Sequence, residues 1–320
     1  MKRNIYLKTI PPAEAVARVK ASIDREALIR EETIPSHEAS GRVLAHAVHA
    51  RYSSPTFHSA AMDGYAVNAR STFAAREGHP LTLKAGETCF AVNTGHPMPE
   101  GCDAVIMIEQ VVLDGGSVTI EAPAFPWQHV RRIGEDIVAT ELLFPRNHQL
   151  RPWDVGALLS GGIWDVPVWE RVTVRIIPTG DEVLDFTTHP DPGKGQVVES
   201  NSQMLAALAR ELGCVVERAA PVPDNPEALH QALKDSLDAG RHLTIFCAGS
   251  SAGSKDFTRA TLEKEGEILT HGIAAMPGKP SLLANCRGRL VAGAPGYPVS
   301  ALVCFKELLE PLISWLSHRE

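Results

Sequence analysis

The sequence lacks three features that would each point to a particular class of protein. It has no apolar stretch near the roughly 18 to 20 residues that a membrane-spanning helix needs. It has no apolar core of a signal peptide behind its two early basic residues, so we expect a cytoplasmic protein. Its six cysteines are scattered and none falls in a C-x-x-C pair. This spacing predicts reduced, mostly buried thiols and argues against disulfides or a zinc site.

The sequence also lacks an excess of basic charge. Its formal net charge is -7, and the acidic residues are spread along the chain. Such a surface argues against nucleic acid or an anionic membrane as a partner. The P-loop and the G-x-G-x-x-G fingerprint are both missing, which argues against the usual nucleoside triphosphate and dinucleotide enzymes. With 320 residues, 44% of them hydrophobic, the chain can form two or three domains.

Strands and helices alternate in the second half of the chain. Short β-branched runs occur at VTVRII (172–177), CVVERAA (214–220) and HLTIFCAG (242–249), and helical patterns follow the first two. This alternation predicts a doubly wound α/β domain over residues 170–320, with a mostly parallel sheet and helices on both faces. Ligands of such domains bind beyond the carboxyl ends of the strands.

The first half of the chain has a different pattern. Residues 51–136 contain many short β-like runs separated by glycine and proline, which predicts a compact β domain. Amphipathic helical patterns lie on either side of it, at 11–23 and 151–163. We therefore predict a split helical domain formed by residues 1–50 and 137–169, with the β domain inserted. The fold class is α/β and multidomain.

Acidic residues in or beside predicted turns are the first candidates for a site. They are Asp63, Asp136, Glu182, Asp224 and Asp256. Taken singly, each is more typical of a helix cap or a solvated turn. However, three of the five follow strands of the α/β half, and carboxylate oxygens suit Mg²⁺ bound together with substrate phosphates. From the residues alone, both interpretations stay open.

Two loops of the α/β half could hold an anion. GSSAGSKD (249–256) resembles a glycine-bearing cradle of backbone N–H groups. Lys279, in MPGKP, is either a phosphate counter-charge or a solvated loop lysine. His46 and His49 form an H-x-x-H in a strand-like region, where they would not point at one metal ion.

Several motifs together resemble a known family. They are SAAMDGYAV (59–67), NTGHPMPEGCDAVIMIEQV (93–111), VRRIGEDI (130–137), IPTGDEVL (177–184), CAGSSAGSKDFT (247–258), MPGKP (276–280) and GAPGYPVSA (293–301). Their order and spacing are similar to those of the molybdopterin molybdenumtransferases, the MoeA and gephyrin E-domain family. The resemblance extends from the N-terminus to the last helix, and the second motif is the most specific.

The resemblance implies a fold and an activity. Members of this family are elongated homodimers built from a split helical domain, an inserted β domain and a molybdopterin-binding α/β domain. Their cleft lies between the α/β domain of one subunit and the β domain of the other. They bind adenylated molybdopterin and molybdate, and they insert molybdenum with Mg²⁺ present and with loss of AMP. The expected partners are a molybdopterin adenylyltransferase upstream and recipient molybdoenzymes downstream.

The resemblance also assigns roles to individual positions. Asp63, Thr94 and Asp136 would form the β-domain side of the cleft, and Glu182, Asp224 and Asp256 the α/β side. The implied catalytic residues are Asp63, Asp136, Glu182 and Asp224, of which Glu182 and Asp224 would hold the metal. The implied cofactor-binding residues are Thr94, Gly249, Ser250, Ser251, Gly253, Asp256, Lys279, Pro295 and Pro298.

This sequence departs from the family pattern around one ligand site. Ser250 replaces a glycine, Gly272 and Met276 replace lysines, and Tyr297 replaces an asparagine. Losing a cation beside an anionic substrate weakens its binding. A non-catalytic carrier of molybdopterin or of the finished cofactor, and a scaffold use of the dimer, are therefore alternatives to the enzyme. The sequence stops at LEPLISWLSHRE, before the small C-terminal β domain that the resemblance implies.

Overall fold

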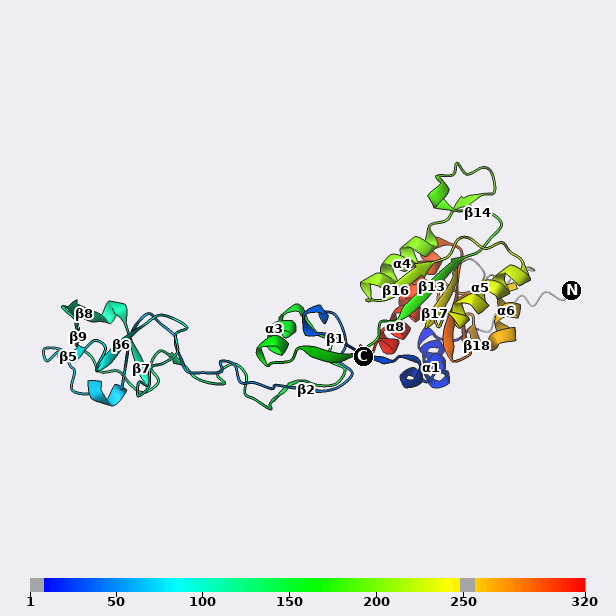
Figure 1. Cartoon of the computed structure of the whole chain (residues 1–320). Coiled ribbons are helices and arrows are strands. Elements are labelled where there is room, and N and C mark those ends of the chain that lie inside the picture. Colours follow the sequence, from blue (N-terminus) through cyan, green and yellow to red (C-terminus); the bar gives the residue numbers. More distant parts are fainter. Residues whose placement is uncertain (1–8, 248–256, 320) are drawn as a thin grey trace.

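The computed structural model describes residues 9–247 and 257–319, which form three modules along an elongated molecule (Figure 1). The α/β module lies at one end and the β module at the other. A smaller linking module lies between them and is crossed by the chain twice. In the described part of the chain, no helix is both long and apolar enough to cross a membrane.

A six-stranded sheet in the order β16-β13-β17-β20-β19-β18 forms the centre of the α/β module. Its strands are β13 (Thr173–Pro178), β16 (Val215–Arg218), β17 (Leu243–Cys247), β18 (Gly266–His271), β19 (Leu282–Cys286) and β20 (Arg289–Ala294). The first four strands in this order pair in parallel, as the sequence predicted. The edge strands β19 and β18 pair antiparallel. This edge was not predicted. It begins at a tight turn in which Arg287 and Gly288 both have positive φ angles, of 52° and 78°.

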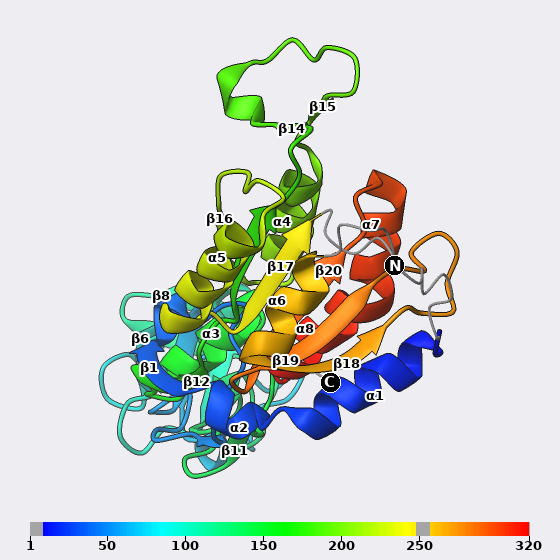
Figure 2. The same ribbon diagram turned by 90° about the vertical axis from the view of Figure 1, so that its right-hand side faces the viewer.

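Helices cover both faces of this sheet, which confirms the predicted architecture (Figure 2). Successive residues of a strand point to opposite faces, so Ile176 and Ile245 lie in one apolar cluster, while Ile177 and Phe246 lie in the other. The second cluster includes Leu229, Leu233 and Leu237 of α5 and Leu262 of α6. The first lies under α1 (Pro12–Ser22), α4 and the C-terminal helices. The helices are α4 (Asn201–Glu211), α5 (Pro226–Asp238), α6 (Phe257–Glu265), α7 (Pro298–Cys304) and α8 (Glu310–Leu316), with a π-helical turn (Phe305–Leu309) between the last two.

The first helix, α1 (Pro12–Ser22), packs against the α/β module, although the sequence assigned it to the split helical domain. Its buried residues Ala15 and Val19 share an apolar cluster with the C-terminal helices. The amide of Asn285 on β19 donates to the carbonyl oxygen of Ser22 at 2.8 Å. An amphipathic pattern shows that a helix has an apolar face, but it does not show which module covers that face.

The linking module contains more strand than the sequence predicted. β1 (Glu31–Pro35) pairs antiparallel with β12 (Asp165–Trp169), and β2 (Val48–His49) with β11 (Leu142–Phe144). The predicted second helix is present as α3 (Pro152–Ser160). The remaining helical segments between residues 24 and 50 are short: α2 (Arg25–Leu28) and a 3₁₀ turn (Ser36–Glu38). His46 lies 2.8 Å from the carboxylate of Glu31.

The β module consists of small antiparallel sheets, in agreement with the β pattern of residues 51–136. β4 (Gly64–Val67) lies between β6 (Cys89–Val92) and β7 (Ala104–Met107). The other strands and turns of the module are β3 (Ser59–Ala60), β5 (Leu81–Lys84), β8 (Val111–Asp114), β9 (Ser117–Ile120), β10 (Val130–Arg131) and 3₁₀ turns at Ala69–Thr72 and Ile108–Gln110. A β-carbon on Gly64 would lie 2.0 Å from the carbonyl oxygen of Ile106. The glycine of MDGY is therefore required by the close approach of β4 to β7.

All six cysteines lie in the described residues as free thiols, and five are buried. Burial raises the pKa of Cys214 to about 12 and that of Cys304 to about 11. These thiols therefore stay protonated at neutral pH.

Candidate functional site

A pocket of about 750 Å³ opens at the carboxyl ends of the parallel strands of the α/β module. Thr179 after β13, Cys247 at the end of β17 and Pro295 after β20 line its floor. Residues 199–201, where α4 begins, and residues 276–280 form two of its walls. The pocket lies where a doubly wound sheet is expected to bind its ligand.

Glu182 lines this pocket from the turn that follows β13. Gly180 has a φ of 136°, and a β-carbon there would lie 2.9 Å from the Oε1 atom of Glu182. The glycine therefore leaves room for the carboxylate. Asp224 lies on the neighbouring turn after β16, where its backbone N–H donates to Oδ1 of Asp181 at 3.1 Å. This hydrogen bond joins the two turns that carry Glu182 and Asp224.

Lys279, Pro295 and Pro298, to which the resemblance assigns cofactor binding, also line the pocket. Lys279 is exposed to solvent. Two substituted positions form part of the rim, since the side chains of Met276 and Tyr297 are 87% and 81% exposed. The mouth of the pocket therefore presents large apolar surfaces beside one lysine.

The backbone conformation at position 272 explains why a glycine occurs there. Gly272 is buried and has a φ of 109°, a region that lysine and other L-residues rarely adopt. Its backbone N–H donates to the carbonyl oxygen of Ser281 at 2.9 Å, and its carbonyl accepts from Ile10 at 3.4 Å. The backbone at this position thus holds the segment before α1 against the loop that carries Lys279.

A buried polar network, which was not predicted from the sequence, lies beside the pocket. The carboxylate of Glu199 is 3% exposed and accepts hydrogen bonds from the backbone N–H and hydroxyl of Ser202, at 2.7 and 2.6 Å. Arg218 on β16 donates to Glu199 at 3.3 Å and to Asp185 at 3.2 Å. An acidic residue just before a helix start is a weak local signal, and its arginine partner is 19 residues away in the sequence.

This network also fixes the base of an arm that extends from the module. The arm runs through β14 (Val183–Leu184), a 3₁₀ turn (Phe186–Thr188) and β15 (Val197–Val198), and its two short strands pair in parallel. It projects beyond the sheet in both views (Figures 1 and 2). Val183, Val197 and Val198 at its base line the pocket.

Asp63 and Thr94 lie in direct contact on the β module. Oδ1 of Asp63 accepts from the backbone N–H of Thr94 at 2.7 Å and from its hydroxyl at 2.9 Å. These two hydrogen bonds hold the pKa of Asp63 below its ordinary value of 3.8, and the bond from the backbone N–H has the larger effect. Asp136 is exposed on the same module, with a carboxylate oxygen 4.0 Å from Nη1 of Arg131.

One chain does not bring the two predicted sides of the cleft together. Asp63 and Asp136 lie on the β module, whereas Glu182 and Asp224 lie on the α/β module at the other end of the molecule (Figure 1). In the described part of the chain, no group of three or more histidine, cysteine or acidic side chains could by itself hold a metal ion. The remaining predicted site residues lie outside the described residues: Gly249, Ser250, Ser251, Gly253 and Asp256.

Comparison with known proteins identifies the family. A family model described as the MoeA N-terminal region (domain I and II) matches residues 10–162, and one described as a probable molybdopterin binding domain matches residues 175–315. A molybdopterin molybdenumtransferase of Haemophilus influenzae is 34% identical over an alignment of 309 residues that covers 90% of this chain and 74% of that protein. The chain belongs to the MoeA family. The resemblance drawn from the motifs is therefore confirmed.

Other relatives of this MoeA-family chain agree. A molybdopterin molybdenumtransferase of Synechococcus elongatus is 32% identical over 301 residues, covering 88% of this chain and 74% of that protein. The crystal structure of a molybdopterin biosynthesis MoeA protein from Pyrococcus horikoshii superposes with a TM-score of 0.82 at 29% identity. It covers 98% of this chain and 81% of that one. The α/β multidomain fold is thus shared over nearly the whole chain, and membership supports a place in molybdenum cofactor biosynthesis.

Proposed function

We propose that this MoeA-family protein is a molybdopterin molybdotransferase, which inserts molybdate into adenylated molybdopterin with release of AMP and depends on Mg²⁺. The observation that carries the proposal is the pocket at the strand ends, in which Glu182 and Lys279 lie on different walls. Its volume of about 750 Å³ falls within the roughly 300–1,000 Å³ typical of small-molecule sites. The names of the relatives supply the substrate class.

The walls of the pocket suit a planar ligand that bears phosphate. Val183, Val197 and Pro295 offer apolar contact, while the ammonium group of Lys279 offers the positive charge that a phosphate needs. Asn201 is held in place by a hydrogen bond from its amide to the carbonyl oxygen of Gly296, at 2.7 Å. This bond fixes the start of α4 against the turn before α7, so two walls of the pocket keep a constant spacing.

The acidic residues fit a magnesium ion whose shell is completed by the substrate. Mg²⁺ usually takes one or two protein carboxylates together with water and substrate phosphates. Glu182 on the pocket wall and Asp224 on the adjoining turn supply that number, and we propose that they hold the ion. When bound, the cation neutralises charge on the pyrophosphate. The hydrogen bond from the Asp224 backbone to Asp181 keeps the two turns together before the substrate arrives.

We further propose that the active form is a homodimer, because one chain holds the two halves of the site apart. In the dimer, Asp63, Thr94 and Asp136 of one subunit would face the pocket of the other. The hydrogen bonds from Thr94 keep Asp63 ionised and oriented, which suits a role beside the cation and its substrate. A cytoplasmic location, an upstream adenylyltransferase and recipient molybdoenzymes belong to the same proposal.

A complementation experiment tests the shared site. We expect Asp63→Asn and Glu182→Gln each to abolish AMP release from adenylated molybdopterin in the presence of Mg²⁺ and molybdate. When the two variants are mixed and allowed to exchange subunits, half of the dimers contain one of each, and one of their two sites is intact. The mixture should therefore recover about a quarter of the wild-type activity.

Glu87→Gln is the matched control, because Glu87 is exposed on the β module and pairs only loosely with Lys84, at 3.5 Å. It should keep full activity. Full activity in either single variant would remove that residue from the site. A mixture that exchanges subunits but stays inactive would contradict the shared cleft. Tight pterin binding by the wild type without AMP release would favour the carrier instead.

A further inference from the structure

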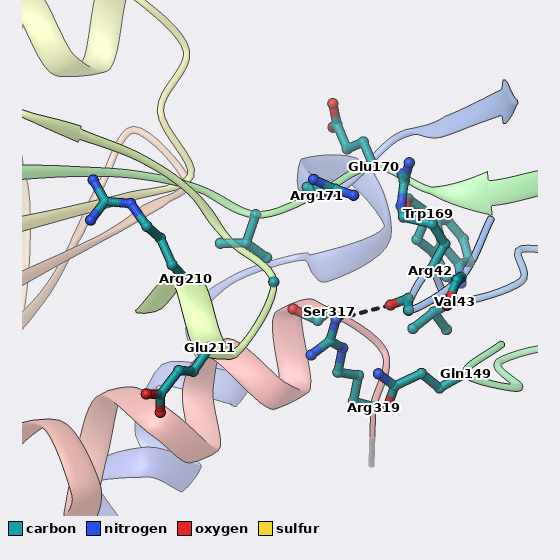
Figure 3. Close-up of a pocket in the computed structure, with 14 residues that line it drawn as sticks. Arg42, Val43, Gln149, Trp169, Glu170, Arg171, Arg210, Glu211, Ser317 and Arg319 are labelled. Atoms are coloured by element: carbon teal, nitrogen blue, oxygen red, sulfur yellow. Dashed lines mark hydrogen bonds between the residues drawn. The ribbon is translucent and has the colours of Figure 1, made fainter. Parts of the chain in front are cut away.

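A second pocket lies between the linking module and the α/β module, away from the strand ends (Figure 3). Its volume is about 340 Å³. Five segments meet there: residues 40–43 and Gln149 of the linking module, the connection from β12 to β13, the end of α4 and the segment after α8. The pocket therefore lies at the joint between two modules.

Three guanidinium groups face this pocket from different segments, those of Arg42, Arg171 and Arg319 (Figure 3). Arg42 is 9% exposed, pairs with Glu32 and donates to the carbonyl oxygen of Trp169 at 2.8 Å. Arg319 donates through Nη2 to the carbonyl oxygen of Gly41 at 3.2 Å. Arg171 forms no hydrogen bond or ion pair with any other residue that the structure describes.

In the described part of the chain, no carboxylate forms an ion pair with Arg171 or Arg319. Glu170 lines the pocket, but its carboxylate accepts from the backbone N–H of Arg30 at 2.7 Å and lies 3.4 Å from Nε2 of His242. The side chain of Glu211 points away from Arg171 and Arg319 in Figure 3. The lining of the pocket includes four arginines and two glutamates, so it carries a net positive charge.

Arg319 is held in this position at a cost. Its Nε atom is buried without a hydrogen-bond partner among the described residues. Burial lowers the pKa of Arg319, and repulsion from Arg171 and Arg42 lowers it further. A buried, unsatisfied donor beside like charges is unfavourable unless a ligand compensates it.

The end of α4 is shaped to accommodate this arginine. Gly213 has a φ of 80°, and a β-carbon there would lie 2.6 Å from Nη2 of Arg319. Any other residue at position 213 would displace the guanidinium group. The glycine thus allows Arg319 to lie against the backbone and to face Arg171.

We infer that this pocket binds a small tetrahedral oxyanion of the phosphate class between Arg171 and Arg319. Guanidinium groups suit such ligands because their N–H groups form pairs of charge-assisted hydrogen bonds to two oxygens. The bound anion would join the segments from both modules and so favour one orientation between them. This site is independent of the proposed transferase pocket and would stand if that proposal failed.

The test is calorimetric titration of the full chain with inorganic phosphate at constant ionic strength. We expect binding to the wild type, and a loss of about tenfold or more in affinity for Arg171→Ala and for Arg319→Ala, since each removes charge-assisted hydrogen bonds. Arg171 is exposed, so its variant should keep the wild-type melting temperature without ligand. Sulfate and molybdate, titrated in the same way, show which oxyanion the site prefers.

Two control variants separate this site from other sources of binding. Arg210→Ala removes an arginine of the same pocket whose guanidinium points away from Arg171, and it should bind phosphate as the wild type does (Figure 3). Lys279→Ala removes the cation of the other pocket and should also leave this binding unchanged. Equal phosphate affinity in wild type, Arg171→Ala and Arg319→Ala would overturn the inference. The inference would also be overturned if none of the three oxyanions, phosphate, sulfate and molybdate, bound to the wild type.

Discussion

Replacing Arg218 with methionine should destabilise the α/β module, because it leaves the buried carboxylate of Glu199 without its counter-charge. The side chains of Arg218 and Glu199 are only 15% and 3% exposed. Removing one partner of a buried ion pair costs about 3–5 kcal/mol. Glu199 would keep its two hydrogen bonds from Ser202, so we expect the lower end, about 3 kcal/mol. Methionine keeps the apolar length of the side chain, which limits the loss of packing.

The assay is urea unfolding followed by far-UV circular dichroism, a signal that comes mainly from the helices of this module. Adding Glu199→Gln to Arg218→Met should recover part of the loss, because both charges are then gone. The matched control is Arg259→Met, whose pair with Glu263 is about half exposed and should be worth less than about 1 kcal/mol. A loss in Arg218→Met no larger than in this control would refute the reasoning.

Three further changes have expected outcomes of different sign. Gly64→Ala should lower the free energy of unfolding by at least about 3 kcal/mol, because the new β-carbon would lie 2.0 Å from the carbonyl oxygen of Ile106. We expect faster hydrogen exchange of the backbone amides of β4, and exchange as slow as in the wild type would contradict this prediction. Gly156→Ala should instead stabilise the folded protein by about 0.5–1 kcal/mol, since Gly156 is exposed within α3 and no atom beyond the adjacent helix backbone lies within 4 Å of the position of a β-carbon. An unchanged or lower urea midpoint of unfolding would argue against this. Burial lowers the pKa of His242, whose Nδ1 accepts from the backbone N–H of Thr173 at 3.0 Å. As the pH falls, the unfolded chain therefore takes up a proton on His242 before the folded chain does, so the stability is full above pH 6.5 and falls below it. His242→Gln should reduce the dependence of stability on pH between pH 7 and 5. An equal dependence in the variant and the wild type would exclude His242 as its cause.

The alternation of strands and helices in the α/β module could be predicted because each buried strand has a local signature. β13 and β17 are short apolar runs bounded by turn residues, and α5 begins at Pro226, directly after the capping side chain of Asn225. The antiparallel edge could not be predicted, because β18 alternates weakly and lies partly exposed. Its direction depends on pairing with β19, which local sequence does not specify.

The candidate site divides in the same way. Glu182 could be placed at the pocket because the ends of parallel strands converge, whereas Lys279, in the loop between β18 and β19, was assigned only by the family resemblance. The role of Glu199 could not be predicted, since it depends on an ion pair with Arg218, which only the fold brings near. The oxyanion pocket was even harder to predict from the sequence, because Arg171 and Arg319 are far apart in the sequence and line one pocket only through the packing of two modules.

The most direct test of the proposed function is AMP release from adenylated molybdopterin by the purified protein, measured with and without molybdate in the presence of Mg²⁺. We expect release that requires molybdate and that is lost in Glu182→Gln. This result would also show that Met276 and Tyr297 at the mouth of the pocket are compatible with turnover. Pterin binding without any release of AMP would contradict the account and would assign the pocket to a carrier.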